Sequence, residues 1–363
     1  MKEVPAADLG ADAASLPAVS VIIVNQNGRA FLPVCLGSLA ALYYPQEKLE
    51  VIVVDNASTD GSQEYMQDAY PDVRIIQLDK NYGFCKPNNE GAKISTGQYL
   101  VFLNNDSEVT SVWLDELVKP AMADPDVISV ASKMLYYDRR DLVNTAGGKI
   151  TVIGGGFYRG YGDRNGATYD EPCYTGFGCA AGVLVRRDFF TGIGGFDEDY
   201  FAACEEHDLG WRAWLYGHKV AYAPAAVMYH HESGTFGTRS NYDPAKVYLN
   251  TRNRLYNMVK NLQAGTLARA LLISLGFNTY RWLHMFFSGN LAAAGAICRG
   301  HQDFIRDIGK TLGKRREVQK RRIRSDAELY RLGIIATLKE SMSEERRLGR
   351  LQKEGRYCGE NRR

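Results

Sequence analysis

The chain has 363 residues, of which 45% are hydrophobic and 24% are charged, and its formal net charge is +2. This balance is typical of a folded globular protein, and the length suits a large α/β domain with an appendage. A net charge so close to zero excludes a strong positive field over the whole molecule, so the charge gives no reason to expect nucleic acid as the partner.

The start of the chain lacks the features of an export signal. Residues 1–17 have neither a basic start nor an apolar core segment, so we expect a short disordered lead and no signal peptide. The seven cysteines are scattered, without the CxxC spacing of a zinc site. Both observations favour reduced thiols and a cytoplasmic location.

The first two hundred residues repeat one pattern, in which a short β-branched run is followed by a polar turn and a helical stretch. The apolar runs are continuous rather than alternating, as in strands that are buried on both faces. They cover residues 19–24, 50–55, 73–78, 98–103 and 127–132, and candidate helices between them cover 31–42, 62–70, 86–95 and 112–123. We therefore predict an α/β fold with a doubly wound, mostly parallel sheet, in which ligands bind beyond the carboxyl ends of the strands.

The later part of the chain changes in character. A glycine- and tyrosine-rich irregular segment is followed by a helix, a strand-like run and then mostly helical sequence. The segments are 145–182, 206–216 and 219–231, with further helices at 246–261, 266–275 and 280–298 and a charged tail beyond. We expect three parts: the lead at 1–17, the α/β domain at 18–240 and a C-terminal helical extension at 241–363.

The helical extension raises the question of membrane contact. Arg269, Arg281 and His284 interrupt the apolar sequence at 265–298, so we expect helices that pack on the domain or lie at a membrane surface, and not a spanning helix. The segment 310–324 holds eight Lys or Arg residues and one Glu. A surface that binds anionic lipid and a solvated tail are both open interpretations of this basic segment.

Polar residues follow three of the predicted strands. Residues 25–28 follow the first strand, Asp55 ends the second, and Asn104, Asn105 and Asp106 end the fourth. An acid at the end of the second strand can accept hydrogen bonds from a nucleotide. The group at 104–106 is either an ordinary turn or a site for a hard divalent cation, which prefers oxygen ligands and keeps waters and phosphates in its shell.

Three carboxylates begin the helix at 206–216. Glu205, Glu206 and Asp208 can simply complement the helix dipole, an effect worth roughly 0.3–1 kcal/mol each. A first-turn acid on a rigid helix also meets the need of a general base, and two adjacent carboxylates repel, which can raise the proton affinity of one of them.

A pair of histidines, His230 and His231, ends the strand-like run at 219–231. A histidine in this position has either a structural role or completes a metal shell as neutral imidazole. The following glycines, Gly234 and Gly237, would allow the next segment to move as a lid.

Taken in order, these segments resemble glycosyltransferase family 2, the inverting enzymes of the GT-A fold, and most closely its bacterial rhamnosyltransferase-like branch. The resemblance covers about residues 19–237. It rests on VSVIIVNQNGRAFLPVCLGSL, VIVVDNASTDGS, NYGFCKPNNEGAKISTGQYLVFLNNDSEV, GGFDEDYFAACEEHDLGWRAWLYG and HHESG.

The resemblance implies the following site for the donor. The nucleotide-sugar contacts would be Asn25, Asn27, Asp55, Asn81, Asn104, Asn105 and Asp106. Asp106 would be the chief ligand of a Mg²⁺ or Mn²⁺ ion, with His230 as the distal ligand and His231 as the competing choice. Asn104 departs from the family, which often has an acid there, so Asp106 would act without it.

The resemblance also implies a reaction, in which a sugar passes from a nucleoside diphosphate to an acceptor hydroxyl with inversion. Glu206 would be the base; because the family commonly has Glu followed by Asp where this chain has Glu205 and Glu206, Glu205 and Asp208 remain alternatives. The favoured donor is dTDP-rhamnose, with a UDP-hexose as runner-up. The acceptor would be a cell-surface glycan, such as an O-antigen or cell-wall polysaccharide, or a lipid-linked precursor, reached from the cytoplasmic face of the membrane.

Two rival functions remain. A sugar-phosphate nucleotidyltransferase would need a glycine-rich, basic loop after the first strand, where this chain has only Gly28 and Arg29. A non-catalytic protein that binds sugar nucleotides at a membrane surface would use the basic segment at 310–324 and the apolar helices before it.

Overall fold

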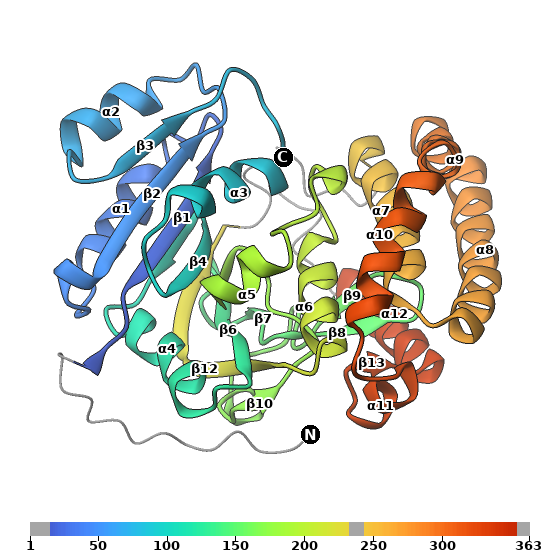
Figure 1. The fold of residues 1–363 in the computed structure, drawn as a ribbon. Helices are drawn as coiled ribbons and strands as arrows, with labels where there is room; N and C mark the ends of the chain where they lie inside the picture. Colours follow the sequence, from blue (N-terminus) through green and yellow to red (C-terminus); the bar gives the residue numbers. More distant parts are fainter. Residues whose placement is uncertain (1–14, 232–242, 354–363) are drawn as a thin grey trace. The chain divides into compact units, whose positions relative to one another are not determined.

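The computed structural model describes residues 15–231 and 243–353, and these residues form two compact units (Figure 1). Unit 1 contains the described residues up to 148 together with 158–201 and those from 218, and unit 2 contains 149–157, 202–217 and the C-terminal residues. The predicted limits of the domain and the extension stay predictions. Most of the predicted lead, and the predicted lid glycines Gly234 and Gly237, lie outside the described residues.

Unit 1 is built on one large sheet with the strand order β10-β12-β6-β11-β4-β1-β2-β3, while β5 pairs with β12 and β7 with β6. Strands β3, β2, β1 and β4 are mutually parallel, and β11 runs antiparallel to both β4 and β6. The strands are β1 Val19–Asn25, β2 Leu49–Asp55, β3 Arg74–Gln77, β4 Tyr99–Asn104, β5 Ser107–Val109, β6 Val127–Tyr136, β7 Val143–Thr145, β10 Cys173–Tyr174, β11 Gly182–Arg186 and β12 Lys219–His230.

Helices cover both faces of this sheet (Figure 1). Val21 and Ile23 of β1 pack with α1 and α4, whereas Ile22 faces α3, where a Cβ on Gly91 would lie 2.6 Å from Cγ2 of Ile22. The helices are α1 Leu32–Ala40, α2 Ser62–Ala69, α3 Cys85–Ile94, α4 Trp113–Ala123 and α5 Arg187–Gly192, with short 3₁₀ turns at Gln46–Lys48, Ala167–Tyr169 and Glu198–Tyr200. Strands covered in this way are apolar on both faces, which is why the predicted strands and helices agree closely with the structure.

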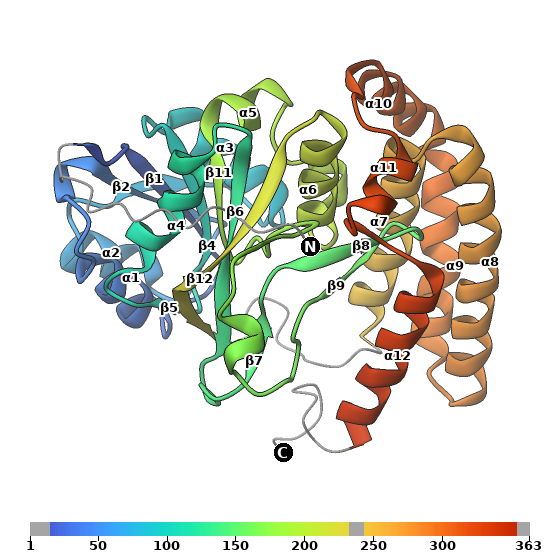
Figure 2. The ribbon, with the colours of Figure 1, turned by 90° about the horizontal axis from the view of Figure 1, so that it is seen from below.

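Unit 2 is mainly helical, and α7, α8 and α9 lie side by side in two views (Figures 1 and 2). Its core joins Val247 of α7, Met285 of α8 and small residues of α9. The elements are α6 Glu205–Leu215, α7 Pro244–Asn261, α8 Ala264–Phe287, α9 Leu291–Arg306, α10 Ile308–Arg321, α11 Asp326–Arg331 and α12 Leu338–Lys353, with a small sheet of β13 Ile335–Ala336, β8 Gly148–Thr151 and β9 Gly156–Tyr158 that lies mostly in this unit.

The predicted break between helices at 266–275 and 280–298 is wrong. Helix α8 runs without interruption through Gly276, and Asn278 is buried there with its amide directed to Ser274 Oγ at 3.4 Å. The helix ends instead at Phe287, and Gly289, two residues later, has the φ of +79° of a left-handed residue. Over 15–231 and 243–353, no helix has both the length and the apolarity needed to cross a bilayer.

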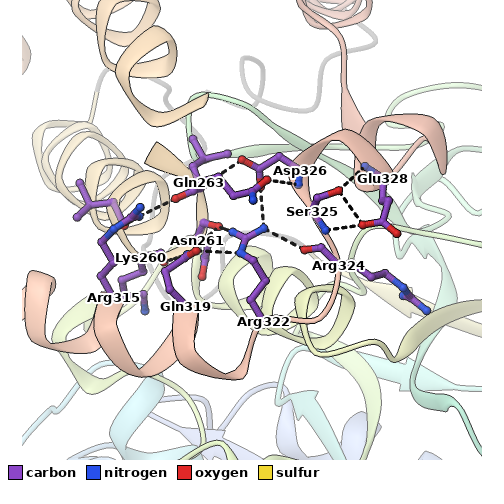
Figure 3. Close-up of polar contacts among 12 residues, drawn as sticks. Lys260, Asn261, Gln263, Arg315, Gln319, Arg322, Arg324, Ser325, Asp326 and Glu328 are labelled. Atoms are coloured by element: carbon purple, nitrogen blue, oxygen red, sulfur yellow. Dashed lines mark hydrogen bonds and ion pairs between the residues drawn. The ribbon is translucent and has the colours of Figure 1, made fainter. Parts of the chain in front are cut away.

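The basic segment 310–324 has a structural role that neither interpretation of the sequence included (Figure 3). Three of its side chains satisfy backbone carbonyls at the carboxyl end of α7, which an α-helix leaves without intrahelical partners. The pairs are Arg315 with Leu262 at 2.6 Å, Gln319 with Lys260 at 2.8 Å, and Arg322 with Asn261. Arg324 donates in the same way to Gly217, beyond the end of α6, at 2.7 Å. A solvated tail is therefore the wrong description of these arginines.

Arg322 is the most connected of these residues, because its Nη1 also forms a buried ion pair with Asp326 at 2.9 Å. We expect Arg322→Ala to lower the free energy of unfolding by about 3 kcal/mol, since it leaves a buried carboxylate without its cation. Chemical denaturation followed by circular dichroism measures this loss. The control Lys320→Ala removes an exposed cation from the same helix and should change stability by less than about 0.5 kcal/mol; equal losses in the two variants would contradict the structural role.

Candidate functional site

The ends of three strands in unit 1 are tied together by buried side chains. Because β1 pairs in parallel with β2 and β4, the residues that follow these strands meet at one edge of the sheet. Asn105 Nδ2 donates to Asn25 Oδ1 at 2.8 Å, and Asn25 Nδ2 donates to Asp55 Oδ1 at 3.1 Å. The other carboxylate oxygen of Asp55 accepts from the Ser58 amide at 3.0 Å and from Gln63 Nε2 at 2.6 Å. The structure thus brings these three predicted residues together, and Asp55 is fully buried among its partners.

Other predicted donor contacts are more accessible. Asn27 and Asn81 are exposed and Asn104 is half-buried. Asn27 adopts a φ of +52° and accepts from the Thr59 amide at 2.8 Å, and Asn81 accepts from Asn56 at 2.9 Å. Hydrogen bonds to neighbouring loops therefore hold Asn27 and Asn81, and both side chains remain accessible from solvent.

Asp106 and His230 lie directly beside each other in unit 1. The antiparallel pairing of β12 with β5 sets His230 opposite Ser107, and its Nε2 lies 3.2 Å from Asp106 Oδ1. Asn104 Nδ2 lies 3.2 Å from the same ring nitrogen. His231 differs, because its ring stacks on Tyr137 with 3.8 Å between centroids. The geometry therefore groups Asp106 with His230 and directs the ring of His231 elsewhere.

These two side chains fit a hard divalent cation. Two ligands on neighbouring corners of an octahedral shell with radii of about 2.1 Å are about 3 Å apart, close to the separation of the Asp106 and His230 atoms. Across 15–231 and 243–353 no group of three or more His, Cys, Asp or Glu residues could hold a metal. Asp106 and His230 would supply two ligands to such a cation, and Mg²⁺ commonly completes its shell with substrate oxygens and water.

The first turn of α6, in unit 2, holds two buried carboxylates. Glu205 is 6% exposed and Glu206 is 8% exposed. Burial, and next the negative charge of Glu206, raise the pKa of Glu205 well above its ordinary value. Burial also lowers the pKa of the neighbouring His207, whose Nε2 lies 3.8 Å from Glu206 Oε1. The pair is therefore arranged so that Glu205 retains a proton more readily than an ordinary glutamate.

Asp208 is surrounded by cationic and amide donors. Its carboxylate is fully buried and forms ion pairs with Arg212 at 2.8 Å and Lys260 at 3.0 Å, and it accepts from Asn261 Nδ2 at 3.0 Å. Such a carboxylate is oriented by its partners. This arrangement gives Asp208 the task of fixing α6 against α7.

Two asparagines on α7, which the sequence analysis did not single out, hold the chain that leads into α6. Asn253 donates to the carbonyl of Ala203 at 2.8 Å, and Asn257 donates to that of Cys204 at 3.2 Å. Ala203 and Cys204 both adopt positive φ, at +71° and +69°, which is strained for residues with a Cβ. The signal was present in the sequence: asparagines at 253, 257 and 261 recur at i and i+4, which places them on one helix face.

A family model matches the part of the chain that forms much of unit 1. Residues 20–190 match the family model described as glycosyl transferase family 2. This region of the chain belongs to glycosyl transferase family 2. The family predicted from the motifs is therefore confirmed, and so is the prediction of an enzyme of the glycosyltransferase class for this domain.

The relatives in sequence include an O-antigen biosynthesis protein and a rhamnosyltransferase. O-antigen biosynthesis protein RfbC of Myxococcus xanthus is 32% identical over 237 residues, which cover 60% of this chain and 18% of RfbC. The N-acetylglucosaminyl-diphospho-decaprenol L-rhamnosyltransferase of Mycobacterium tuberculosis is 28% identical over 57% of this chain and 73% of that protein. The chain thus spans less than a fifth of RfbC.

Solved structures of glycosyltransferases confirm the fold. S. aureus TarS 1-349 in complex with UDP-GlcNAc superposes with a TM-score of 0.55 at 17% identity, over 87% of this chain and 92% of TarS 1-349. The mannosyltransferase PcManGT from Pyrobaculum calidifontis, in complex with GDP-Man and Mn²⁺, gives 0.52 at 16% identity over 83% and 90%. The predicted GT-A type α/β fold with C-terminal helices is therefore confirmed.

The raised pKa of Glu205 makes stability depend on pH. Above the ordinary carboxyl pKa the unfolded chain releases this proton while the folded protein keeps it, so the folded state loses stability as pH rises. We expect Glu205→Gln, which removes this loss, to raise Tm relative to the parent by about 2 °C or more at pH 7.5 and by much less at pH 4. Thermal unfolding at both pH values tests this. Glu64→Gln, at an exposed first-turn glutamate of α2, is the control; a gain from Glu205→Gln that is the same at both pH values would contradict the assignment.

Proposed function

We propose that this protein transfers a sugar from a nucleoside diphosphate to a hydroxyl of a cell-surface glycan or a lipid-linked acceptor, with inversion and with a divalent metal. The observation that carries the proposal is the contact between Asp106 and His230 at the end of β4, in a domain of glycosyl transferase family 2. The rhamnosyltransferase from M. tuberculosis supports dTDP-rhamnose as the donor, and the UDP-GlcNAc complex of TarS supports a UDP-hexose as the alternative.

In this proposal unit 1 holds the donor. Asp106 and His230 would be the protein ligands of Mg²⁺ or Mn²⁺, and the bound cation would supply Lewis-acid stabilisation of the departing diphosphate. The mannosyltransferase complex with GDP-Man and Mn²⁺ supports this use of a metal. Asn27, Asn81 and Asn104 are the accessible candidates for donor contacts, whereas Asn25, Asp55 and Asn105 would serve the donor by fixing the loops.

Unit 2 supplies the base, and Glu206 suits this role better than its neighbours. A general base must be ionised, and the pKa of Glu205, raised well above its ordinary value, makes Glu205 less suited to this role. Asp208 is committed to Arg212 and Lys260. Glu206 would therefore take the proton of the acceptor hydroxyl while the oxygen attacks the anomeric carbon from the face opposite the diphosphate, so that a single displacement inverts that centre.

Two variants separate the donor site from the base. We expect Asp106→Ala to abolish metal-dependent donor binding and turnover, because it removes the carboxylate ligand. Glu206→Gln should keep donor binding and lower transfer by at least about 10²-fold, the usual lower scale for loss of a general base. Calorimetry with nucleotide sugars and Mn²⁺, and release of nucleoside diphosphate across a panel of donors, measure the two effects.

The surface variant Asp68→Ala serves as the control for these measurements. Full metal-dependent turnover by Asp106→Ala would remove the proposed metal site and favour a protein without catalysis. Full transfer by Glu206→Gln would exclude Glu206 as the base and return attention to Glu205.

We also propose that α8 meets the cytoplasmic face of an anionic membrane, which would bring the enzyme to a lipid-linked acceptor. Large apolar side chains of this helix are exposed, including Leu272 at 73%, Leu275 at 61% and Phe287 at 80%. Residues 272, 275, 283 and 286 share one helix face by their spacing. Such a stripe, with Arg269 exposed on the same helix, suits the boundary between headgroups and acyl chains.

The double variant Leu272→Glu with Phe287→Glu should bind vesicles that contain phosphatidylglycerol at least about tenfold more weakly, since each buried apolar side chain contributes roughly 1.5–3 kcal/mol. Co-sedimentation with vesicles measures the binding. Ile323→Glu is a matched control, because Ile323 is also 73% exposed but lies outside α8. If the parent protein fails to bind these vesicles, α8 has no role at a membrane.

A further inference from the structure

Two arginines of unit 2, Arg254 and Arg281, take no part in the helix-end contacts and ion pairs described above. Arg254 of α7 and Arg281 of α8 both lie near one aromatic ring, with their guanidinium carbons 5.7 and 5.6 Å from the centroid of Phe277. Both side chains are half-buried. The ring of Phe277 thus contacts two cations of unit 2.

Neither arginine has an anionic partner. Over residues 15–231 and 243–353, no ion pair joins Arg254 or Arg281 to a carboxylate, and Arg254 Nε and Arg281 Nη1 are buried without a hydrogen-bond partner. Arg212 and Arg322 of the same unit are each paired with a buried aspartate. Since a buried donor without a partner costs about 1–3 kcal/mol or more when it is charged, this arrangement stands out in unit 2.

The electrostatics of the pair favour an anion. Burial, and then the positive charge of Arg254, lower the pKa of Arg281 to about 10, while Glu345 acts weakly in the opposite direction. Arg281 therefore remains charged at neutral pH, and two like charges are held together in a poorly solvated place. An anion bound between them would offset both the repulsion and the missing hydrogen bonds.

The pair lies next to the start of α6. A Cβ on Gly155 would lie 2.7 Å from Arg254 Nε, so the glycine turn between β8 and β9 allows the guanidinium to lie close to the backbone. The charge of Arg254 acts on Cys204 and on His207, which flank Glu205 and Glu206 in the chain. Arg254 is therefore a neighbour of the proposed base.

We propose that Arg254 and Arg281 bind the diphosphate of the acceptor, and this assignment rests on the proposed transferase function. In a sugar 1-diphosphate the reacting hydroxyl and the diphosphate are on the same ring, so a site for the anion belongs near the base that receives the hydroxyl proton. Planar guanidinium groups suit phosphate oxygens through paired hydrogen bonds. The relative from M. tuberculosis, whose name specifies a diphospho-decaprenol acceptor, supports this chemistry.

Direct binding tests the site without any turnover. The probe is inorganic pyrophosphate with EDTA present, so that no metal-bound donor site contributes. We expect calorimetry to detect binding to the parent protein, a loss of at least about tenfold in affinity in Arg281→Gln, and partial recovery in Arg281→Lys, which keeps the charge. Arg299→Gln, at an exposed arginine of α9, should bind like the parent.

A stability measurement guards against a folding artefact. If the arginine pair awaits an anion, Arg281→Gln without pyrophosphate should have a Tm equal to or above that of the parent, and pyrophosphate should raise Tm only in the parent. Equal pyrophosphate binding by the parent and by Arg281→Gln would overturn the anion site. A large fall in the Tm of Arg281→Gln would assign Arg281 to the fold instead.

Steady-state kinetics identify the source of the anion. With a lipid-linked sugar diphosphate as acceptor, Arg281→Gln should raise the acceptor KM at least about tenfold with little change in the donor KM. With a phosphate-free alkyl glycoside, parent and variant should have similar acceptor KM values. A rise in the donor KM alone would mean that the site binds the donor diphosphate and would overturn the acceptor assignment; absence of transfer from every donor would refute the transferase function, while the pyrophosphate result would still decide the anion site.

Discussion

The helix that carries the proposed base depends on one buried carboxylate. Asp208 is fully buried, and ion pairs to Arg212 and Lys260 balance its charge. Removing a partner from such a group typically costs 3–5 kcal/mol, so α6 cannot shift along α7 without a large loss. The asparagines of α7 add to this constraint, because they hold Ala203 and Cys204 in their strained conformation. Glu205 and Glu206 thus begin a rigid helix, which is what a general base requires.

A second polar network, in unit 1, fixes the strand ends by hydrogen bonds instead of ion pairs. Asn105, Asn25 and Asp55 form a chain of hydrogen bonds across three strand ends, and these three side chains include no cation. Their polar groups satisfy one another, so they can be buried at the edge of the sheet without a large penalty. Asp106 and His230 then project beside this fixed edge. The preorganised network keeps the two candidate metal ligands at one separation, which limits the reorganisation needed to bind a cation.

The arginines of unit 2 separate into two groups by their partners. Arg315 and Arg322 donate to the carboxyl end of α7, and their charges are absorbed by helix carbonyls and by Asp326. Arg254 and Arg281 share the ring of Phe277 and form no ion pair among the described residues. The run of basic residues at 310–324 was therefore the weaker indication of a ligand site, because Arg315 and Arg322 of this run stabilise the fold. The two isolated arginines, which lie 27 positions apart in the printed sequence, carry the charge that is left for a ligand.

The sequence alone determined the elements of unit 1 and its family, because a strand buried on both faces is apolar along its length and because Asp55, Asp106 and His230 stand in motifs of fixed order. Local pattern also identified the acidic start of α6. Only the tertiary structure decided which partner each polar group has. It paired Asp106 with His230 rather than with His231, surrounded Asp208 with cations, and left Arg254 and Arg281 without carboxylates. Burial and charge pairing depend on residues far apart in the chain, so their effects on pKa and on ligand binding have no local signature.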